Sequence, residues 1–122
     1  MAVEYKNAIT SVTSTGSDQA VYTCPTTTTQ IQYTAIIKTC TVYNTTGGGG
    51  TLEVKVTDAS ASATISIMKF AASAYAAATT VDVASNGPIV LESEDILKID
   101  TSVQPAIVYI SVMEISDDLR GV

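Results

Sequence analysis

Short runs of β-branched and aromatic residues recur along the whole chain, and turn-forming residues separate them. The run at Thr51–Asp58 is the clearest, because Leu52, Val54 and Val56 alternate with polar residues. Alternation with a period of two gives a strand one buried face and one solvated face. Eight or nine such runs at near-regular spacing predict an all-β chain, folded as an antiparallel β-sandwich that is jelly-roll-like with about eight strands.

The length of 122 residues fits one domain, residues 1–122, which can bury a core without help from a metal or a disulfide. Within the long run at Gln30–Tyr43 the apolar phase shifts after Lys38, which predicts a β-bulge. The polar start at Met1–Asn7 leaves open a flexible arm. Strands are expected at residues 8–15, 20–24, 30–43, 51–58, 64–70, 79–84, 89–91, 96–99 and 107–115.

Three segments between these runs have their own signals. Gly87–Asp100 places an acidic turn, Glu92–Asp95, between two apolar runs and predicts a β-hairpin. The four glycines Gly47–Gly50 are not followed by the Lys-Ser/Thr of a phosphate loop, so we expect a mobile hairpin loop there. Ala71–Ala78 lacks an amphipathic stripe and is too short for a stable helix, so we expect a loop or a single turn.

Composition excludes several classes of partner. The net charge is −6 and the six basic residues are scattered, whereas nucleic-acid binding needs clustered Lys and Arg. No apolar run reaches the roughly 18–20 residues that cross a bilayer, and the start of the chain lacks a signal-peptide layout. We therefore expect a soluble protein that is not exported by the Sec route and binds neither nucleic acid nor membrane. Charged residues make up only 15% of the chain, which suggests that much of its surface faces other protein.

The residues give little basis for catalysis or cofactor binding. The chain has no histidine and one arginine, so we expect no enzyme, no catalytic residue and no cofactor. Glu92, Glu94 and Asp95 leave open a Ca²⁺ site, although acidic turns are usually only solvated. Cys24 and Cys40 cannot form a zinc site without further ligands. A disulfide between them remains open, and the favoured reading is two small buried residues on strands.

The last run, Ile107–Ile115, is apolar on both faces. A strand of this kind is covered on both faces, and in a two-sheet domain a partner subunit can supply the outer cover. The alternative is that loops of the same chain cover it. Val108, Ile110 and Val112 suit the core, and the candidate interface residues are Ile107, Tyr109, Met113 and Ile115.

The order of these segments resembles that of small β-sandwich structural proteins of tailed bacteriophages, which include capsid decoration (cement) proteins and other accessory virion proteins. The resemblance extends over roughly Val21–Ile115 and rests on strand and turn patterns, with no active-site residues to transfer. The segments that carry it are V-Y-T-x-P at Val21–Pro25, A-I-I-K at Ala35–Lys38, C-T-V-Y-N-T-T-G at Cys40–Gly47, G-P-I-V-L at Gly87–Leu91, D-I-L-K at Asp95–Lys98 and V-x-x-S-V-M-E-I at Val108–Ile115.

The resemblance implies a structural role in a virion. The expected function is that of a capsid decoration protein, a homotrimer that binds and stabilises the lattice of the major capsid protein. Its expected location is the capsid surface of a virion assembled in the host cytoplasm. The alternative is a tail, neck or fibre protein, with receptor binding as one role.

Overall fold

The computed structural model describes residues 1–13, 18–103 and 105–118. This part of the chain forms nine strands and no helix, so none that could cross a membrane. The strands are β1 (Ala2–Val12), β2 (Gln19–Thr23), β3 (Ile31–Asn44), β4 (Leu52–Asp58), β5 (Ala63–Phe70), β6 (Thr80–Asp82), β7 (Ile89–Glu92), β8 (Ile96–Thr101) and β9 (Ala106–Asp118).

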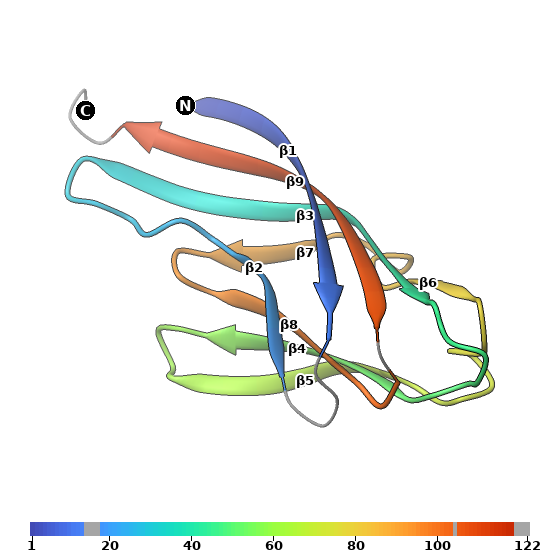
Figure 1. Cartoon of the computed structure of the whole chain (residues 1–122). Helices are drawn as coiled ribbons and strands as arrows, with labels where there is room; N and C mark the ends of the chain where they lie inside the picture. Colours follow the sequence, from blue (N-terminus) through green and yellow to red (C-terminus); the bar gives the residue numbers. More distant parts are fainter. Residues whose placement is uncertain (14–17, 104, 119–122) are drawn as a thin grey trace.

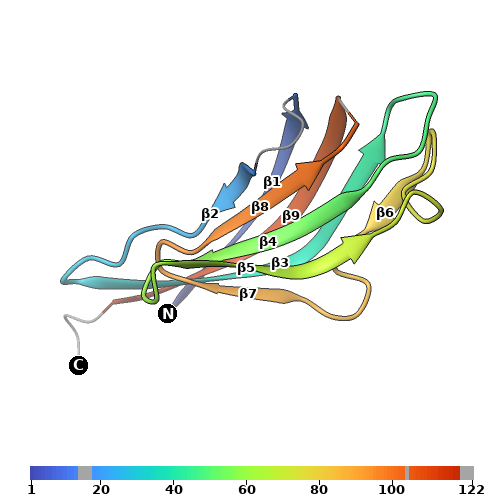
Figure 2. The ribbon, with the colours of Figure 1, turned by 90° about the horizontal axis from the view of Figure 1, so that it is seen from below.

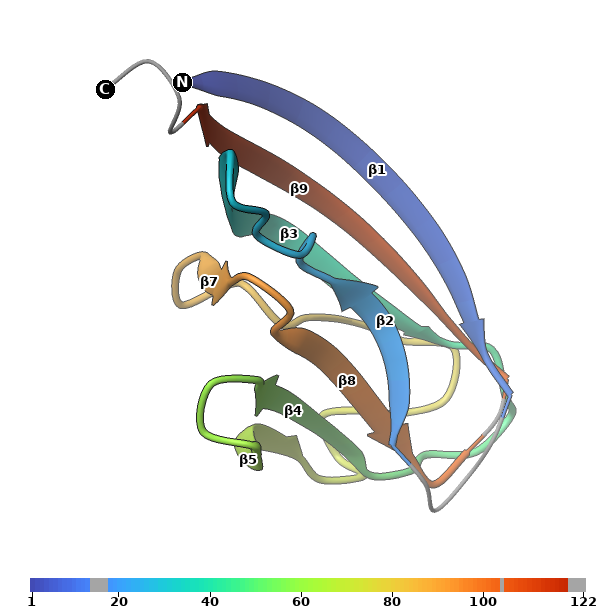
Figure 3. The same ribbon diagram turned by 90° about the vertical axis from the view of Figure 1, so that its left-hand side faces the viewer.

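The strands form two antiparallel sheets that face each other (Figure 1). Sheet A has the order β1-β9-β3, and both β6 and β7 pair with the remaining side of β3. Sheet B has the order β2-β8-β4-β5. Seen from the side, β1, β9 and β3 form one curved layer over the smaller layer of β2, β8, β4 and β5 (Figure 3). The predicted all-β sandwich is confirmed, and its nine strands overlap the nine expected ranges, with β6 shortened to three residues.

The chain passes from one sheet to the other at most of its connections, as it does in a jelly roll. Only β4 and β5 are consecutive strands paired to each other in a hairpin, on the side of the sandwich that Figure 2 shows in front. The predicted bulge in β3 is confirmed, because its register with β9 shifts between Ile37 and Thr39. The shift moves the apolar phase, so that both halves of this long strand still face the core.

The core lies between the sheets and consists mainly of the alternating residues that the sequence places inward. Leu52 and Val54 of β4 and Val108 and Ile110 of β9 are fully buried, as predicted. Tyr75 is also fully buried, although it lies in the turn that Ala71 begins, where Tyr75 N–H donates to Ala71 C=O at 2.9 Å. The pattern of the strands gave no sign that a residue of this turn would complete the core.

The segment Gly87–Asp100 is not a hairpin, which corrects the sequence prediction. β7 pairs with β3 in sheet A, whereas β8 pairs with β2 and β4 in sheet B. The acidic turn crosses between the sheets, and the buried Asp95 holds it: its Oδ1 accepts the N–H of Ala59 at 3.0 Å and its Oδ2 accepts that of Glu92 at 2.9 Å. An apolar–polar–apolar pattern is the same for a hairpin and for a crossing between sheets, so only long-range pairing separates the two.

The start of the chain and the glycine loop also differ from the sequence prediction. Ala2–Asn7 is no flexible arm, because it forms the first half of β1 and pairs with Ser116–Ser111 of β9. Gly47–Gly50 connects β3 of sheet A to β4 of sheet B and so is not a hairpin loop. The side chain of Asn44 binds this loop, since its Nδ2 donates to Gly48 C=O at 3.0 Å. A Cβ on Gly50 would lie 2.7 Å from side-chain atoms of Ser102 and Val103, so this position requires glycine.

Candidate functional site: an apolar face on sheet A

The outward side of sheet A carries apolar side chains from four strands, and one row of cross-strand partners is apolar across all four. Cross-strand partners in an antiparallel sheet point to the same face. Tyr5 of β1, Met113 of β9, Ile36 of β3 and Val90 of β7 form one such row. We call the whole set the apolar face: Val3, Tyr5, Ile9, Ile36, Tyr43, Val90, Ile107, Tyr109, Met113 and Ile115.

The four candidate interface residues of the last strand all lie on this face. Tyr109 is 40% exposed, and Ile107, Met113 and Ile115 are half-buried between the neighbouring strands. They lie on the side of β9 opposite to Val108, Ile110 and Val112, which face the core. This division between two apolar faces is the one that the sequence predicted. Their contact with a partner subunit stays a prediction.

The sequence did not identify the residues that make this face large. Tyr5 is 75% exposed, Ile9 70% and Val90 60%, more than any of the four predicted residues. The sequence gives no signal for Tyr5 and Ile9, because Met1–Asn7 is polar and the run that follows alternates only weakly. It gives none for Val90 either, because only the pairing of β7 with β3, which sets Val90 opposite Ile36, adds this residue to the face.

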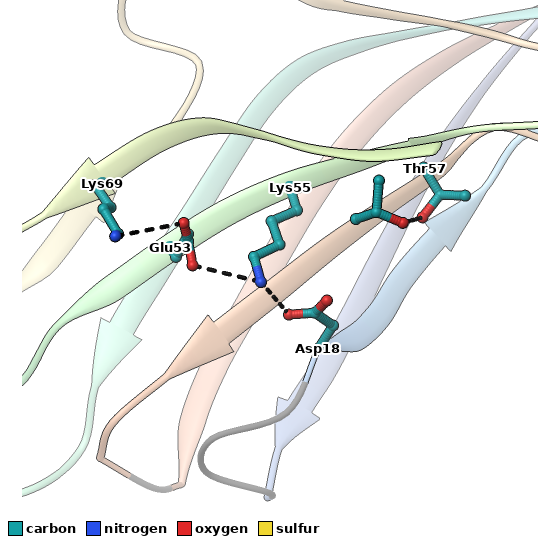
Figure 4. A network of polar contacts seen from close by, with 6 residues as sticks. Asp18, Glu53, Lys55, Thr57 and Lys69 are labelled. Carbon is teal, nitrogen blue, oxygen red and sulfur yellow. Dashed lines mark hydrogen bonds and ion pairs between the residues drawn. The ribbon is translucent and has the colours of Figure 1, made fainter. Parts of the chain in front are cut away.

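The outward side of sheet B is the opposite in character. Lys55 forms ion pairs with Asp18 at 2.8 Å and with Glu53 at 3.4 Å. Lys69 forms a further ion pair with Glu53 at 3.8 Å (Figure 4). Thr57 continues this polar surface through a hydrogen bond of 2.8 Å to Thr64 on β5. One side of the sandwich is thus suited to water, and the other exposes several large apolar side chains on either side of the polar row of Asn7 and Ser111, as an interaction site would.

A charged cluster lies at one end of sheet A, on its inward side. Glu114 of β9 is buried, and its Oε1 lies 2.9 Å from Nζ of Lys6 on β1. The hydroxyl of Tyr22 on β2 donates to the other carboxylate oxygen and so ties sheet B to sheet A. The hydrogen bond to Glu114 raises the pKa of Lys6, and burial together with the same carboxylate raises the pKa of Tyr22. The cluster joins the two sheets where the core ends.

Neither cysteine is placed for thiol chemistry. Cys24 and Cys40 are free and fully buried, so the disulfide alternative does not hold in this structure. Cys40 lies on β3, and Cys24 immediately follows β2. Burial raises the pKa of Cys24 to about 11 and that of Cys40 to about 12, which keeps both thiols protonated at neutral pH. A protonated buried thiol is a poor nucleophile and a poor metal ligand.

These two thiols predict a loss of stability in alkaline solution. The unfolded chain releases the thiol protons near pH 9, whereas the folded chain holds them until about pH 11 for Cys24 and 12 for Cys40. The contribution of the two thiols to the free energy of unfolding should therefore be constant well below pH 9 and fall by up to about 1.4 kcal/mol per pH unit for each thiol above it. Urea unfolding between pH 8 and pH 10.5 measures this slope. Cys40→Ala should lower this slope by the contribution of one thiol; Cys24 supplies the rest, with Tyr22 adding to it near pH 10, since its pKa is also raised. An unchanged slope would contradict the assignment.

The acidic turn residues do not converge on one point that the structure leaves open for a cation. Both carboxylate oxygens of Asp95 accept backbone N–H groups, and Glu94 Oε1 accepts the hydroxyl of Thr26 at 3.3 Å. Within the described ranges no three Asp, Glu, Cys or His side chains gather as metal ligands would. The carboxylates of Asp95 and Glu94 are therefore used in hydrogen bonds within the crossing between the sheets.

A surface hollow of about 600 Å³ lies where β4 and β5 meet the loop after β8. Thr51, Glu53, Lys69, Phe70 and Ser102 are among its lining residues. Two of them, Glu53 and Lys69, already bind each other as an ion pair. The hydroxyl oxygen of Ser102 accepts the N–H of Thr51 at 2.7 Å. Because these polar groups of the lining already bind one another, the apolar face is the stronger candidate for function.

Comparisons with known proteins add little to this picture. No protein-family model and no curated protein matches the chain. Among solved structures it is similar to a chain from "Bacillus endospore appendages form a novel family of disulfide-linked pili", with 9% identity and a TM-score of 0.47 over 96% of this chain and 88% of that one. It is also similar to a chain of the infectious bursal disease virus Gx strain, with 12% identity and a TM-score of 0.46 over 98% of this chain and 32% of that one. At these scores the likeness supports no conclusion about function.

Proposed function

We propose that this protein is a structural subunit of a virion, a capsid decoration protein that binds and stabilises the lattice of the major capsid protein. The observation that carries the proposal is the contrast between the apolar outward side of sheet A and the charged outward side of sheet B. The resemblance of the strand and turn segments to accessory virion proteins of tailed phages supplies the setting. Copies of the chain form a homotrimer on the capsid surface, and the apolar face is their contact with neighbouring protein.

The energetics suit a role of this kind. A standard protein interface buries about 1,600 Å² in total, and an exposed sheet face supplies one side of such an interface. Apolar area removed from water contributes about 25 cal/mol per Å², part of which offsets the loss of rotational and translational freedom. A decoration protein meets its lattice at many equivalent places, so a modest affinity at each contact stabilises the whole shell.

A tail, neck or fibre protein is the second candidate, because the same fold can serve either role. Receptor binding by a fibre would favour aromatic side chains at loop tips. Tyr5, Tyr43 and Tyr109 instead lie in strands, on the broad apolar face. This placement favours packing against another protein over binding a sugar at a loop tip.

The test is binding to capsids. Purified protein is mixed with phage shells that lack decoration, and bound protein is quantified after sedimentation, with tail structures as the parallel target. Saturable binding to shells at a fixed ratio to the major capsid protein is the expected result. Light scattering of the free protein over a dilution series should give three times the monomer mass of 12.7 kDa. Binding to tails alone would favour the second candidate, and binding to neither would refute both.

A further inference from the structure

Edge strands of a sheet present unpaired backbone groups, and natural proteins usually protect them from pairing with another chain. Here β6 and β7 are short, with 3 and 4 residues, and Pro88 directly precedes β7. β2 has 5 residues, an irregular register and Pro25 two positions after its end. β5 carries a bulge and the exposed Lys69. Each of these four edges has at least one protecting feature.

β1 is not short and has neither a proline nor a bulge, although Glu4 and Lys6 place exposed charges on it. It has 11 residues, contains no proline and pairs with β9 without a break in register, so its outer edge is long and regular. In Figure 3 it forms the outer rim of the upper layer, with β9 as its neighbour in the sheet. An edge of this length, rich in exposed apolar side chains, is a template for a further strand.

At Ser11 and Thr13 the side chain of Gln19 already occupies the free edge of β1. The side-chain amide of Gln19 donates to Ser11 C=O at 3.1 Å, and its oxygen accepts the N–H of Thr13 at 3.3 Å. A carbonyl bound in this way points away from β9, because a carbonyl facing β9 would be used within the sheet. Backbone direction alternates along a strand, so the odd-numbered residues before Ser11 also face the free edge. Residues 2–9 therefore remain available for pairing.

The charges on this stretch select one antiparallel register with a second copy. Centring the pair on Glu4 or on Lys6 would set two like charges directly opposite each other, which is destabilising. Centring it on Asn7 would need the edge at Ser11 that Gln19 occupies. Centring it on Tyr5 sets Glu4 opposite Lys6 twice, Tyr5 opposite Tyr5, and Val3 opposite Asn7 twice.

The single chain also lacks a second cation at this place. Glu4 lies directly opposite Glu114 in the β1–β9 register, a like-charge pair. Lys6 is shared between them, 2.9 Å from Glu114 and 3.9 Å from Glu4. In the register centred on Tyr5, Lys6 of each copy lies across from Glu4 of the other, so each Glu4 lies near two lysines, and two lysines are shared among four carboxylates.

We propose that two copies of this protein join along β1 in an antiparallel pair centred on Tyr5, so that sheet A continues from one copy into the other. The side chains of Val3, Tyr5 and Ile9 then lie in the middle of a joined apolar face of double width. The pairing is two-fold and uses the edge of the sheet, whereas a homotrimer over the apolar face would use its surface. The two contacts use different groups, so one particle can hold both. In solution the β1 contact would join trimers, so the free protein should have three times the monomer mass at low concentration and a higher mass where β1 also pairs.

Single-cysteine cross-linking tests the register. In an antiparallel pair, opposite residues have Cβ atoms about 5 Å apart, and a shift of four residues separates them by about 14 Å. Tyr5→Cys should form a covalent dimer with itself under mild oxidation, and a mixture of Val3→Cys and Asn7→Cys should form a mixed dimer. Asn7→Cys alone should form no covalent dimer. The unmodified chain is the control, because its Cys24 and Cys40 are fully buried.

Efficient cross-linking of Asn7→Cys to itself, or none by Tyr5→Cys, would overturn the proposed register. A charge variant adds a second measurement. Glu4→Lys replaces both attractive pairs with repulsive ones on a side chain that is 69% exposed, and should weaken dimer formation at least about tenfold. Glu4→Gln should weaken it less. Equal effects of the two variants would mean that Lys6 does not face Glu4 across the contact.

The β1 contact and the proposed function can fail separately in these experiments. Tyr109→Asp changes the middle of the apolar face and should leave the Tyr5→Cys cross-link intact. Loss of capsid binding with the cross-link preserved would leave the β1 contact standing. Capsid binding preserved without any cross-link would refute the β1 contact and leave the decoration role standing.

Discussion

Replacing Tyr109 with aspartate should weaken the association of this protein with its partner subunits by about a hundredfold and leave its fold intact. Tyr109 lies on β9, between Ile9 of β1 and Thr41 of β3, and its side chain is 40% exposed. A carboxylate buried there against an apolar surface would have no partner. Burying an unpaired charge costs several kcal/mol, and about 2.7 kcal/mol corresponds to a hundredfold loss of affinity.

Light scattering and capsid sedimentation measure the effect, and thermal unfolding checks the fold. Thr23→Asp is the matched control. Thr23 is exposed on β2 and is paired with Ile96 of β8, so it belongs to sheet B and lies away from the apolar face. The control should assemble like the original chain. If Tyr109→Asp fails to fold as a monomer, Tyr109 belongs to the core; if it assembles normally, the apolar face is not the contact.

Replacing Asn44 with alanine should lower the free energy of unfolding by about 3 kcal/mol. The Asn44 side chain is fully buried where β3 ends. Its Nδ2 donates to the carbonyls of Gly48 and Ala76, both at 3.0 Å, and its Oδ1 accepts from the N–H of Thr46 at 2.9 Å and from its hydroxyl at 2.6 Å. Each bond contributes about 1 kcal/mol net, and the unpaired buried groups left behind cost more.

Chemical denaturation gives the free energy directly, and the melting temperature should fall by about 10 °C. Thr45→Ala is the neighbouring control: Thr45 is exposed, and it makes one side-chain hydrogen bond, to Pro105 C=O at 2.6 Å. The control should lose less than about 1 kcal/mol. Equal losses for the two variants would show that Asn44 does not hold the glycine loop to the turn that contains Tyr75.

The inward faces of the strands could be read from the sequence because burial follows the period of the strand. Leu52 and Val54 on β4, and Val108 and Ile110 on β9, lie inside as predicted. The shift after Lys38 also appears where the apolar phase changes. In each case a local pattern reports which side of a strand faces water.

Which strand pairs with which could not be read in this way. β7 and β8 looked like a hairpin because hydrophobic periodicity is identical whether the next strand stays in the sheet or crosses to the other. The start of the chain looked like an arm because Glu4 and Lys6 interrupt its apolar residues. Its partner, β9, lies more than 90 positions away in the sequence, and nothing local in Ala2–Asn7 indicates that pairing.

The candidate site shows the same division. The sequence by itself determined that the chain is all-β, that β9 is apolar on both sides and that the chemistry of catalysis is scarce. The tertiary structure alone decided that Tyr5, Ile9 and Val90 join Tyr109 on one face, and that the charges of Glu53 and Lys55 gather on the other. The physical reason is that a strand's own pattern fixes which way each side chain points, whereas a surface is made by the register of strands distant in the chain, which depends on the packing of the whole sandwich.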